Sequence, residues 1–125
     1  MSRTIIYNAE IVNEGTRRHG YVIIDGELIS KTGDGTPSDE ELAGADDCVD
    51  IEGRMLLPGA IDTHVHFREP GLTHKASMAT ESAAAVSGGI TSFIDMPNTR
   101  PATTSQGAVA DKKRIAAEIS YADFG

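Results

Sequence analysis

The segment AIDTHVHFREPG, residues 60–71, carries a polar side chain at every second position: Asp62, His64, His66 and Arg68. Side chains of a β-strand alternate between its two faces, so this spacing predicts a strand with all four groups on one face. The apolar run MLLPGAI that leads into it indicates a buried strand. Polar groups on a buried strand cost free energy unless they are paired or bind a metal ion. The row is therefore the first candidate for a functional site.

The two histidines predict a metal site. Because they are two residues apart on one strand, both imidazoles come within reach of one ion, and neutral imidazole is a good zinc ligand. Asp62 is placed to orient a ligand histidine or to accept a hydrogen bond from it. A His-x-His pair alone is more often two partly exposed histidines. The aspartate and the arginine in the same row reverse that balance and favour a metal.

Arg68 and Asn98 are candidates for binding an anionic substrate. Guanidinium is a planar fork that suits a carboxylate, although an arginine alone would also fit a solvated surface. Asn98 lies in the PNT that ends a second apolar strand, ITSFIDM, and offers a donor and an acceptor, although asparagine is also typical of turns. Strands of a parallel sheet end on one side, where ligands bind, so we expect Asn98 near the histidines and Arg68.

Four other residues have plainer interpretations. We expect Asp95 to bond to the main chain, Glu69 to be solvated before the Pro70-Gly71 turn, and His74 to be exposed at the start of a helix. Cys48, the single cysteine, fits a small core or surface residue. It allows no disulfide within the chain, which agrees with a reducing compartment.

Residues 1–53 are predicted to form a small, mostly antiparallel β unit. The segment GYVIIDGELISK places Asp25-Gly26 between two apolar runs, which predicts a tight hairpin. Residues 32–47 are rich in glycine, proline and acidic residues and predict an exposed loop. A short strand, CVDIEGR, is expected after that loop.

Residues 54–125 alternate strands with helices. Strands are expected at residues 55–67, 90–96 and 121–125, with helices between them. Thr73 would cap the first helix, Gly88-Gly89 would end it, and one face would combine Ala76, Ala79, Ala83 and Val86. The second helix covers residues 105–120, with Ala108, Ile115 and Ile119 on one face. This β-α-β-α-β order predicts a parallel sheet with crossover helices.

The composition excludes several classes of function. The formal net charge of −8 argues against non-specific binding to nucleic acid, which needs basic surfaces. No window approaches the roughly 20 apolar residues of a membrane span, and the first residues lack the apolar core of a signal peptide. We therefore expect a cytoplasmic protein. Three parallel strands need cover on both faces, so we also expect the N-terminal portion of a longer protein.

Two motifs resemble a known family. LPGAIDTHVHFREPG and DMPNTRPAT are similar to the two signature blocks of dihydroorotases, cyclic amide hydrolases of the amidohydrolase superfamily. The resemblance implies an α/β fold, a (β/α)₈ TIM-type barrel carrying a small β-sandwich. Residues 1–53 would supply the N-terminal share of the sandwich. Residues 54–125 would supply the first two βα units and the start of the third barrel strand.

The resemblance also implies roles for single residues. His64 and His66 match the metal-ligand pair, with one or two divalent ions, zinc above all. Arg68 and Asn98 match positions that hold the substrate carboxylate, and Asp62 matches a supporting acid. The implied reaction is the reversible interconversion of dihydroorotate and N-carbamoyl-aspartate in pyrimidine synthesis. The implied partner is a small anionic substrate, neither nucleic acid nor membrane, and a homo-oligomer stays open.

Two alternatives follow from the same motifs. Allantoinases and hydantoinases share Asp-x-His-x-His, but allantoinase-like sequences tend to have FNEPG where this chain has FREPG. Their substrates lack the ring carboxylate that Arg68 would bind. A non-catalytic homologue is the other alternative, and it predicts that the family's later metal ligands are missing.

We expect no catalysis from residues 1–125 alone. The family uses a later lysine, further histidines and a later aspartate, whereas Lys75, Lys112 and Lys113 fall on predicted helices. A (β/α)₈ barrel also needs roughly 250 residues. A steady-state assay of the isolated 125-residue chain with dihydroorotate checks this expectation. Robust turnover would contradict it.

Overall fold

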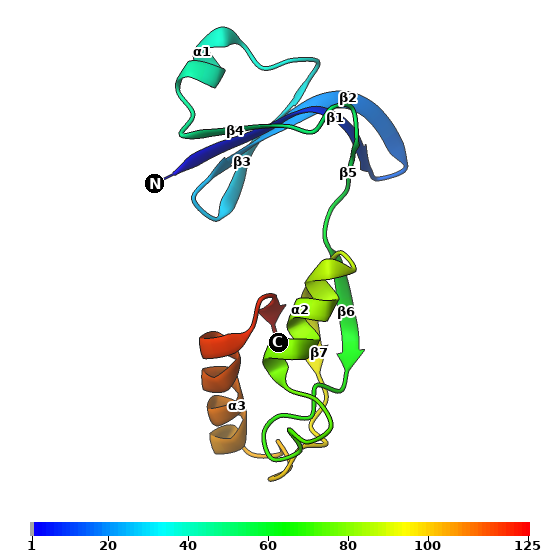
Figure 1. The fold of residues 1–125 in the computed structure, drawn as a ribbon, viewed down its shortest axis with the longest axis vertical. Helices are drawn as coiled ribbons and strands as arrows, with labels where there is room; N and C mark the ends of the chain where they lie inside the picture. The colour runs from blue at the N-terminus through cyan, green and yellow to red at the C-terminus, as the bar shows by residue number, and fades with distance from the viewer. Residues whose placement is uncertain (1) are drawn as a thin grey trace. The chain divides into compact units, whose positions relative to one another are not determined.

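The computed structural model describes residues 2–125. The contacts within the chain divide it into two compact units, one ending at Pro58 and the other beginning at Gly59 (Figure 1). The division thus falls somewhat later than the boundary expected at residue 53. The assignment of these two parts to a sandwich and a barrel stays a prediction.

The first unit is a mixed β-sheet built around one long central strand. Its order is β3-β2-β1-β4, and β5 also pairs with β1. The predicted hairpin at Asp25-Gly26 is confirmed, since β2 and β3 are antiparallel and Gly26 has φ 64°. β4 and β5 run parallel to β1, so the unit is less antiparallel than the sequence suggested. The strands are β1 (Arg3–Asn13), β2 (Thr16–Asp25), β3 (Leu28–Asp34), β4 (Asp47–Asp50) and β5 (Met55–Leu56).

A β-bulge lets β1 bury side chains on both faces of this sheet. Between Ile6 and Ala9 the pairing advances three residues along β1 but only two along β2, and Asn8 has φ 54°. One extra residue reverses which face each later side chain occupies. Ile5 therefore packs in one apolar cluster, and Ala9 packs in another, beside Val22.

The predicted loop at residues 32–47 contains a short helix, α1 (Asp39–Ala43). Its N-cap, Ser38, and Glu41 form a capping box in which each side chain accepts from the other residue's main-chain N–H. Ser-x-x-Glu is the sequence signature of such a box, and the surrounding glycine and proline obscured it. Glu41 also accepts hydrogen bonds from Lys31, across 2.5 Å, and from the hydroxyl of Tyr21.

The strand expected at residues 55–67 is divided in two. Met55 and Leu56 form β5 in the first unit, whereas β6 (Ala60–Val65) begins the second. Between them lie Pro58 and Gly59. A side chain at Gly59 would overlap Thr91, so the main chain passes too close to the neighbouring strand for any larger residue.

The second unit confirms the predicted β-α-β-α-β order. Its sheet is parallel, in the order β6-β7-β8. Both helices contribute to one apolar cluster with the sheet, in which Val65, Phe67 and Phe93 meet Met78 of the first helix and Ala116 of the second. The remaining elements are α2 (Met78–Ser87), β7 (Ile90–Asp95), α3 (Gln106–Ile119) and β8 (Asp123–Phe124).

The first helix of this unit begins later than expected. Ser77, not Thr73, is the N-cap of α2, because its hydroxyl accepts from the main-chain N–H of Thr80. The predicted stop is confirmed, with Gly88 as C-cap and Gly89 at φ 88°.

The buried faces of both helices also differ from the expected ones. Met78 and Ser82 are the buried residues of α2, while Ala83 and Val86 are exposed, because the one long apolar side chain, Met78, sets the rotation of an alanine-rich helix. In α3 the buried residues are Lys112 and Ala116. No helix in the described part of the chain is both long enough and apolar enough to cross a membrane.

The capping box gives a test of stability against pH. Lys31, the main-chain N–H of Ser38 and the hydroxyl of Tyr21 lower the pKa of Glu41 from 4.5 to about 2. This lowered pKa contributes stability that is complete above pH 4.5 and is lost as the pH falls towards 2. Glu41→Gln keeps the capping box but removes the charge. We expect it to lower the free energy of unfolding at pH 7 and to flatten its dependence on acid pH, measured by urea unfolding.

Glu118→Gln is the matched control for Glu41→Gln. Glu118 pairs with Arg114 across 3.1 Å, but both side chains are more than half exposed. Exposed pairs contribute about 0–1 kcal/mol. The same change in pH dependence for both variants would contradict the role given to Glu41.

Candidate functional site

The two histidines project away from the apolar core at the end of β6. His64 and His66 are exposed, whereas Val65 and Phe67, which alternate with them, are buried against the helices. The two imidazole rings lie edge to face, with centroids 5.1 Å apart and an interplanar angle of 72°. Packing of Val65 and Phe67 therefore determines the direction in which both imidazoles point.

The four polar residues do not form one regular row. β6 ends at Val65, and the pairing between Asp62 and Val65 advances three residues on β6 against two on β7. Arg68 lies beyond the strand end and has φ 69°. The prediction of one strand face with all four groups is therefore wrong, because strict alternation requires a regular ladder through Arg68. The arginine follows the histidines on a turn instead.

Asp62 bonds to the main chain of the first histidine. Its Oδ1 accepts from the main-chain N–H of His64 across 3.0 Å. The carboxylate thus holds the backbone that carries the imidazole, and makes no bond to the ring itself. A supporting role for Asp62 stays a prediction, now with this contact as its basis.

Asn98 meets the second histidine. Nδ1 of His66 lies 2.9 Å from Oδ1 of Asn98, and because an amide oxygen only accepts, the ring must donate from Nδ1. In the neutral imidazole, Nε2 of His66 is then the nitrogen with a free lone pair. Ligand histidines in metal sites are commonly oriented by such a bond on the opposite ring nitrogen. The expectation that Asn98 lies near the histidine pair holds for His66.

The histidine pair fits a divalent metal ion as part of a ligand set. It offers two exposed imidazoles, one of them in a defined tautomer. Among residues 2–125 no group of three or more histidine, cysteine, aspartate or glutamate side chains converges on one point. An ion held by this pair would take its other ligands from groups other than these two imidazoles.

Asp95 and Lys112 form a buried ion pair behind the strand ends. Asp95 accepts from the main-chain N–H of Phe67 across 3.0 Å, as the sequence predicted. Its other oxygen lies 2.8 Å from Nζ of Lys112. The sequence reasoning missed this partner, although a lysine one turn before the buried Ala116 in an otherwise apolar stripe was a signal for it.

Two hydrogen bonds, one to the start of α2 and one to the loop after β7, fasten the segment that carries Arg68. Oε2 of Glu69 accepts from the main-chain N–H of Met78 across 2.8 Å, so Glu69 binds the start of α2, where a negative charge is favourable, instead of being merely solvated. The main-chain N–H of Arg100 donates to the carbonyl of Pro70 across 3.0 Å. His74 is exposed, as expected, but it lies in a turn before α2 and not at the start of the helix. Cys48 is a surface residue.

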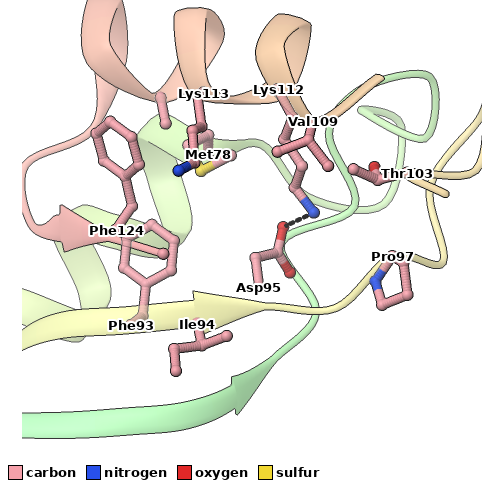
Figure 2. A pocket seen from close by; sticks show the side chains of 12 residues that line it. Met78, Phe93, Ile94, Asp95, Pro97, Thr103, Val109, Lys112, Lys113 and Phe124 are labelled. Atoms are coloured by element: carbon pink, nitrogen blue, oxygen red, sulfur yellow. Dashed lines mark ion pairs between the residues drawn. The ribbon is translucent and has the colours of Figure 1, made fainter. Parts of the chain in front are cut away.

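A separate cavity of about 190 Å³ lies between α3 and the sheet (Figure 2). Phe93 and Asp95 point towards it from β7, and Ile94 points to the opposite side of the strand. Neither histidine, nor Arg68 nor Asn98, lines it. The cavity is part of the helix-covered face and is distinct from the candidate site.

Comparison with known proteins identifies the family. The amidohydrolase family model matches residues 55–121. The chain belongs to the amidohydrolase family. Dihydroorotases of Methanosphaera stadtmanae and Methanosarcina acetivorans are 48% identical over 71% of this chain and 40% identical over 96% of it. An allantoinase of Streptomyces avermitilis is 37% identical over 92% of the chain. The resemblance drawn from the two motifs is thus confirmed.

The solved structures agree with the amidohydrolase assignment. The L-hydantoinase (dihydropyrimidinase) from Arthrobacter aurescens superposes on the whole chain with a TM-score of 0.84 and 28% identity. The predicted fold class is therefore confirmed for this chain. The chain covers 27% of that hydantoinase and 20% to 25% of the three relatives, so it spans about a quarter of their length.

The close approach of Gly71 to the main chain of Arg100 gives a test of how the loop that carries Arg68 is held. Gly71 has φ 81°, and a Cβ there would overlap the main-chain oxygen of Arg100. Gly71→Ala should therefore cost more than about 1 kcal/mol of unfolding free energy, because it adds a backbone clash to the left-handed conformation. Gly89→Ala, at φ 88° with no atom within 4 Å, should cost only the conformational part. Equal losses in urea unfolding would contradict the clash.

Proposed function

We propose that the protein containing this chain is a dihydroorotase. It would hydrolyse a cyclic amide reversibly, interconverting dihydroorotate and N-carbamoyl-aspartate in pyrimidine synthesis. The observation that carries the proposal is Arg68, which follows the histidine pair directly in FREPG. Dihydroorotate has a ring carboxylate that a guanidinium can bind, whereas allantoin and simple hydantoins have none. The identity to dihydroorotases supports the same substrate.

His64 and His66 would hold the metal, with zinc as the favoured ion and one or two ions in the complete site. A bound divalent ion lowers the pKa of water and polarises a carbonyl oxygen, which supplies the chemistry of hydrolysis. The residues of this chain prepare that site. Asn98 accepts from Nδ1 of His66, which leaves Nε2 as the nitrogen available to a metal in the neutral ring, and Asp62 fixes the main chain at His64.

Arg68 and Asn98 would hold the substrate carboxylate. Oδ1 of Asn98 is engaged with His66, which leaves its Nδ2 hydrogens to donate to an anion. Arg68 is half-buried, and the loop that carries it is fastened at Glu69 and Pro70, so its guanidinium would extend towards an anion from a fixed main chain. Together they would orient the ring towards the metal, an effect of position more than of acid–base chemistry.

The remaining parts of the proposal concern the whole protein. A closed (β/α)₈ barrel with a small β-sandwich would place the other metal ligands and the proton shuttle at the same end as His64 and His66. The amidohydrolase assignment and the parallel β6-β7-β8 sheet support this architecture. A homo-oligomer and a cytoplasmic location stay predictions.

Substrate charge gives the test of this proposal. In the full-length protein, Arg68→Ala should lower kcat/KM for dihydroorotate about 10- to 100-fold, since a hydrogen bond to a charged group contributes about 1.5–3 kcal/mol. The effect should fall mainly on KM. Metal content should be unchanged, because Arg68 is not a ligand in the proposed site. Steady-state kinetics and metal analysis of the same preparations measure both.

Two controls separate the alternatives. Arg100→Ala removes an exposed arginine from the neighbouring loop and should leave kcat/KM unchanged. His64→Ala should remove both metal and activity. If the wild type instead hydrolyses allantoin or a hydantoin, and Arg68→Ala leaves that activity intact, the protein is an uncharged-ring hydrolase. An absence of turnover on all three substrates with no bound metal would support a non-catalytic homologue.

A further inference from the structure

The buried ion pair of Asp95 and Lys112 has no part in the proposed reaction. The side chain of Asp95 is 2% exposed and that of Lys112 is 10% exposed, with 2.8 Å between Oδ2 and Nζ. Lys112 extends from α3 towards the end of β7, where the side chain of Asp95 points towards it (Figure 2). The pair lies on the helix side of the sheet, opposite to the side on which the histidines are exposed.

Its hydrogen bonds converge on the main chain around His66. Oδ1 of Asp95 accepts from the N–H of Phe67, the residue after the histidine. The N–H of Met96, the residue after Asp95, donates to the carbonyl of Val65, the residue before the histidine, across 3.0 Å. Nζ of Lys112 also donates to the carbonyl of Met96, across 2.9 Å. One lysine thus contacts both Asp95, the last residue of β7, and Met96, the residue after it, and these two bond to the main chain on either side of His66.

Stability alone does not explain such a pair. Replacing a buried ion pair by apolar residues of similar volume is often neutral or stabilising, because desolvation offsets most of the attraction. An apolar pair here would leave the N–H of Phe67 without this acceptor, where β6 has already ended. The aspartate supplies that acceptor, and the lysine compensates its charge in the buried position.

We propose that Asp95 is a positioning residue, held by Lys112, that fixes the main chain between His66 and Arg68. In this way Asp95 positions the proposed metal ligand, His66, on one side of Phe67 and the proposed anion-binding residue, Arg68, on the other. The inference rests on the proposed role of His64 and His66 as metal ligands. It adds that contacts on the helix-covered face of the sheet determine the geometry of the histidine pair.

Two double variants of the full-length protein test the role of the acceptor. Asp95→Asn with Lys112→Met removes both charges but keeps an amide oxygen for the N–H of Phe67. Asp95→Leu with Lys112→Met removes both charges and the acceptor. We expect zinc affinity of the apoprotein, measured by competition with a chelator, to be near wild type in the first. In the second, the zinc Kd should rise roughly tenfold or more, the range seen when groups that orient metal ligands are lost.

Ser82→Ala is the matched control for general loss of structure. Ser82 is fully buried in the same unit and also accepts from a main-chain N–H, that of Tyr121, across 3.1 Å. We expect this variant to lower the melting temperature without changing the zinc Kd. Equal zinc affinity for the two double variants would overturn the proposal. A wild type that binds no zinc would instead refute the proposal that His64 and His66 bind a metal ion.

Hydrogen exchange gives a second measurement that needs no variant to fold. The amides of Phe67 and Met96 should be protected in the metal-free wild type, because their bonds do not depend on the ion. Metal should add little further protection to the peptide that contains them. Fast exchange of both amides in the metal-free protein would overturn the proposal as well.

Discussion

The bonding of the end of β6 to the end of β7 is the interaction on which the candidate site depends. β6 stops at Val65, yet the next residues carry the second histidine and the arginine. Without the ladder, the main chain there is held by Asp95 and Met96. The same end of β7 leads to Asn98, which orients His66. A single junction of two parallel strands therefore places groups from two distant segments of the sequence.

The apolar core determines which way the histidines face. Phe67 packs on Phe93 with ring centroids 4.5 Å apart, and Val65 belongs to the same cluster. A slip of one residue would place His66 in this core and a phenylalanine at the surface, which burial of an unpaired imidazole forbids. The most apolar contacts of the second unit thus specify the position of its most polar groups. This packing explains why His64 and His66 have a defined orientation although the pairing of β6 with β7 is irregular.

The sequence predicted the features that depend on short segments. It did not predict those that depend on packing against residues distant in the sequence. The hairpin at Asp25-Gly26 and the β-α-β-α-β order both follow from local patterns. The bulge in β1, the early end of β6 and the rotation of α2 depend on what packs against each element. Lys112 is the clearest failure, since its place in an apolar helix stripe signals a buried partner but does not say that the partner is Asp95.

The loop after β6 separates two properties of the site. Arg68 and Gly71 have positive φ, which lets the chain turn away from the strand, and Glu69 ties the turn to the start of α2. The side chain at position 68 is therefore carried by a turn fixed through its neighbours, whereas the histidines are fixed by the core. In the proposed site, a change of the residue at position 68 would alter contact with the substrate without disturbing the bonds that position His66. Under the proposed function, a family that keeps Asp-x-His-x-His could change its substrate at this one position, and the arginine in FREPG would be the group that selects an anion.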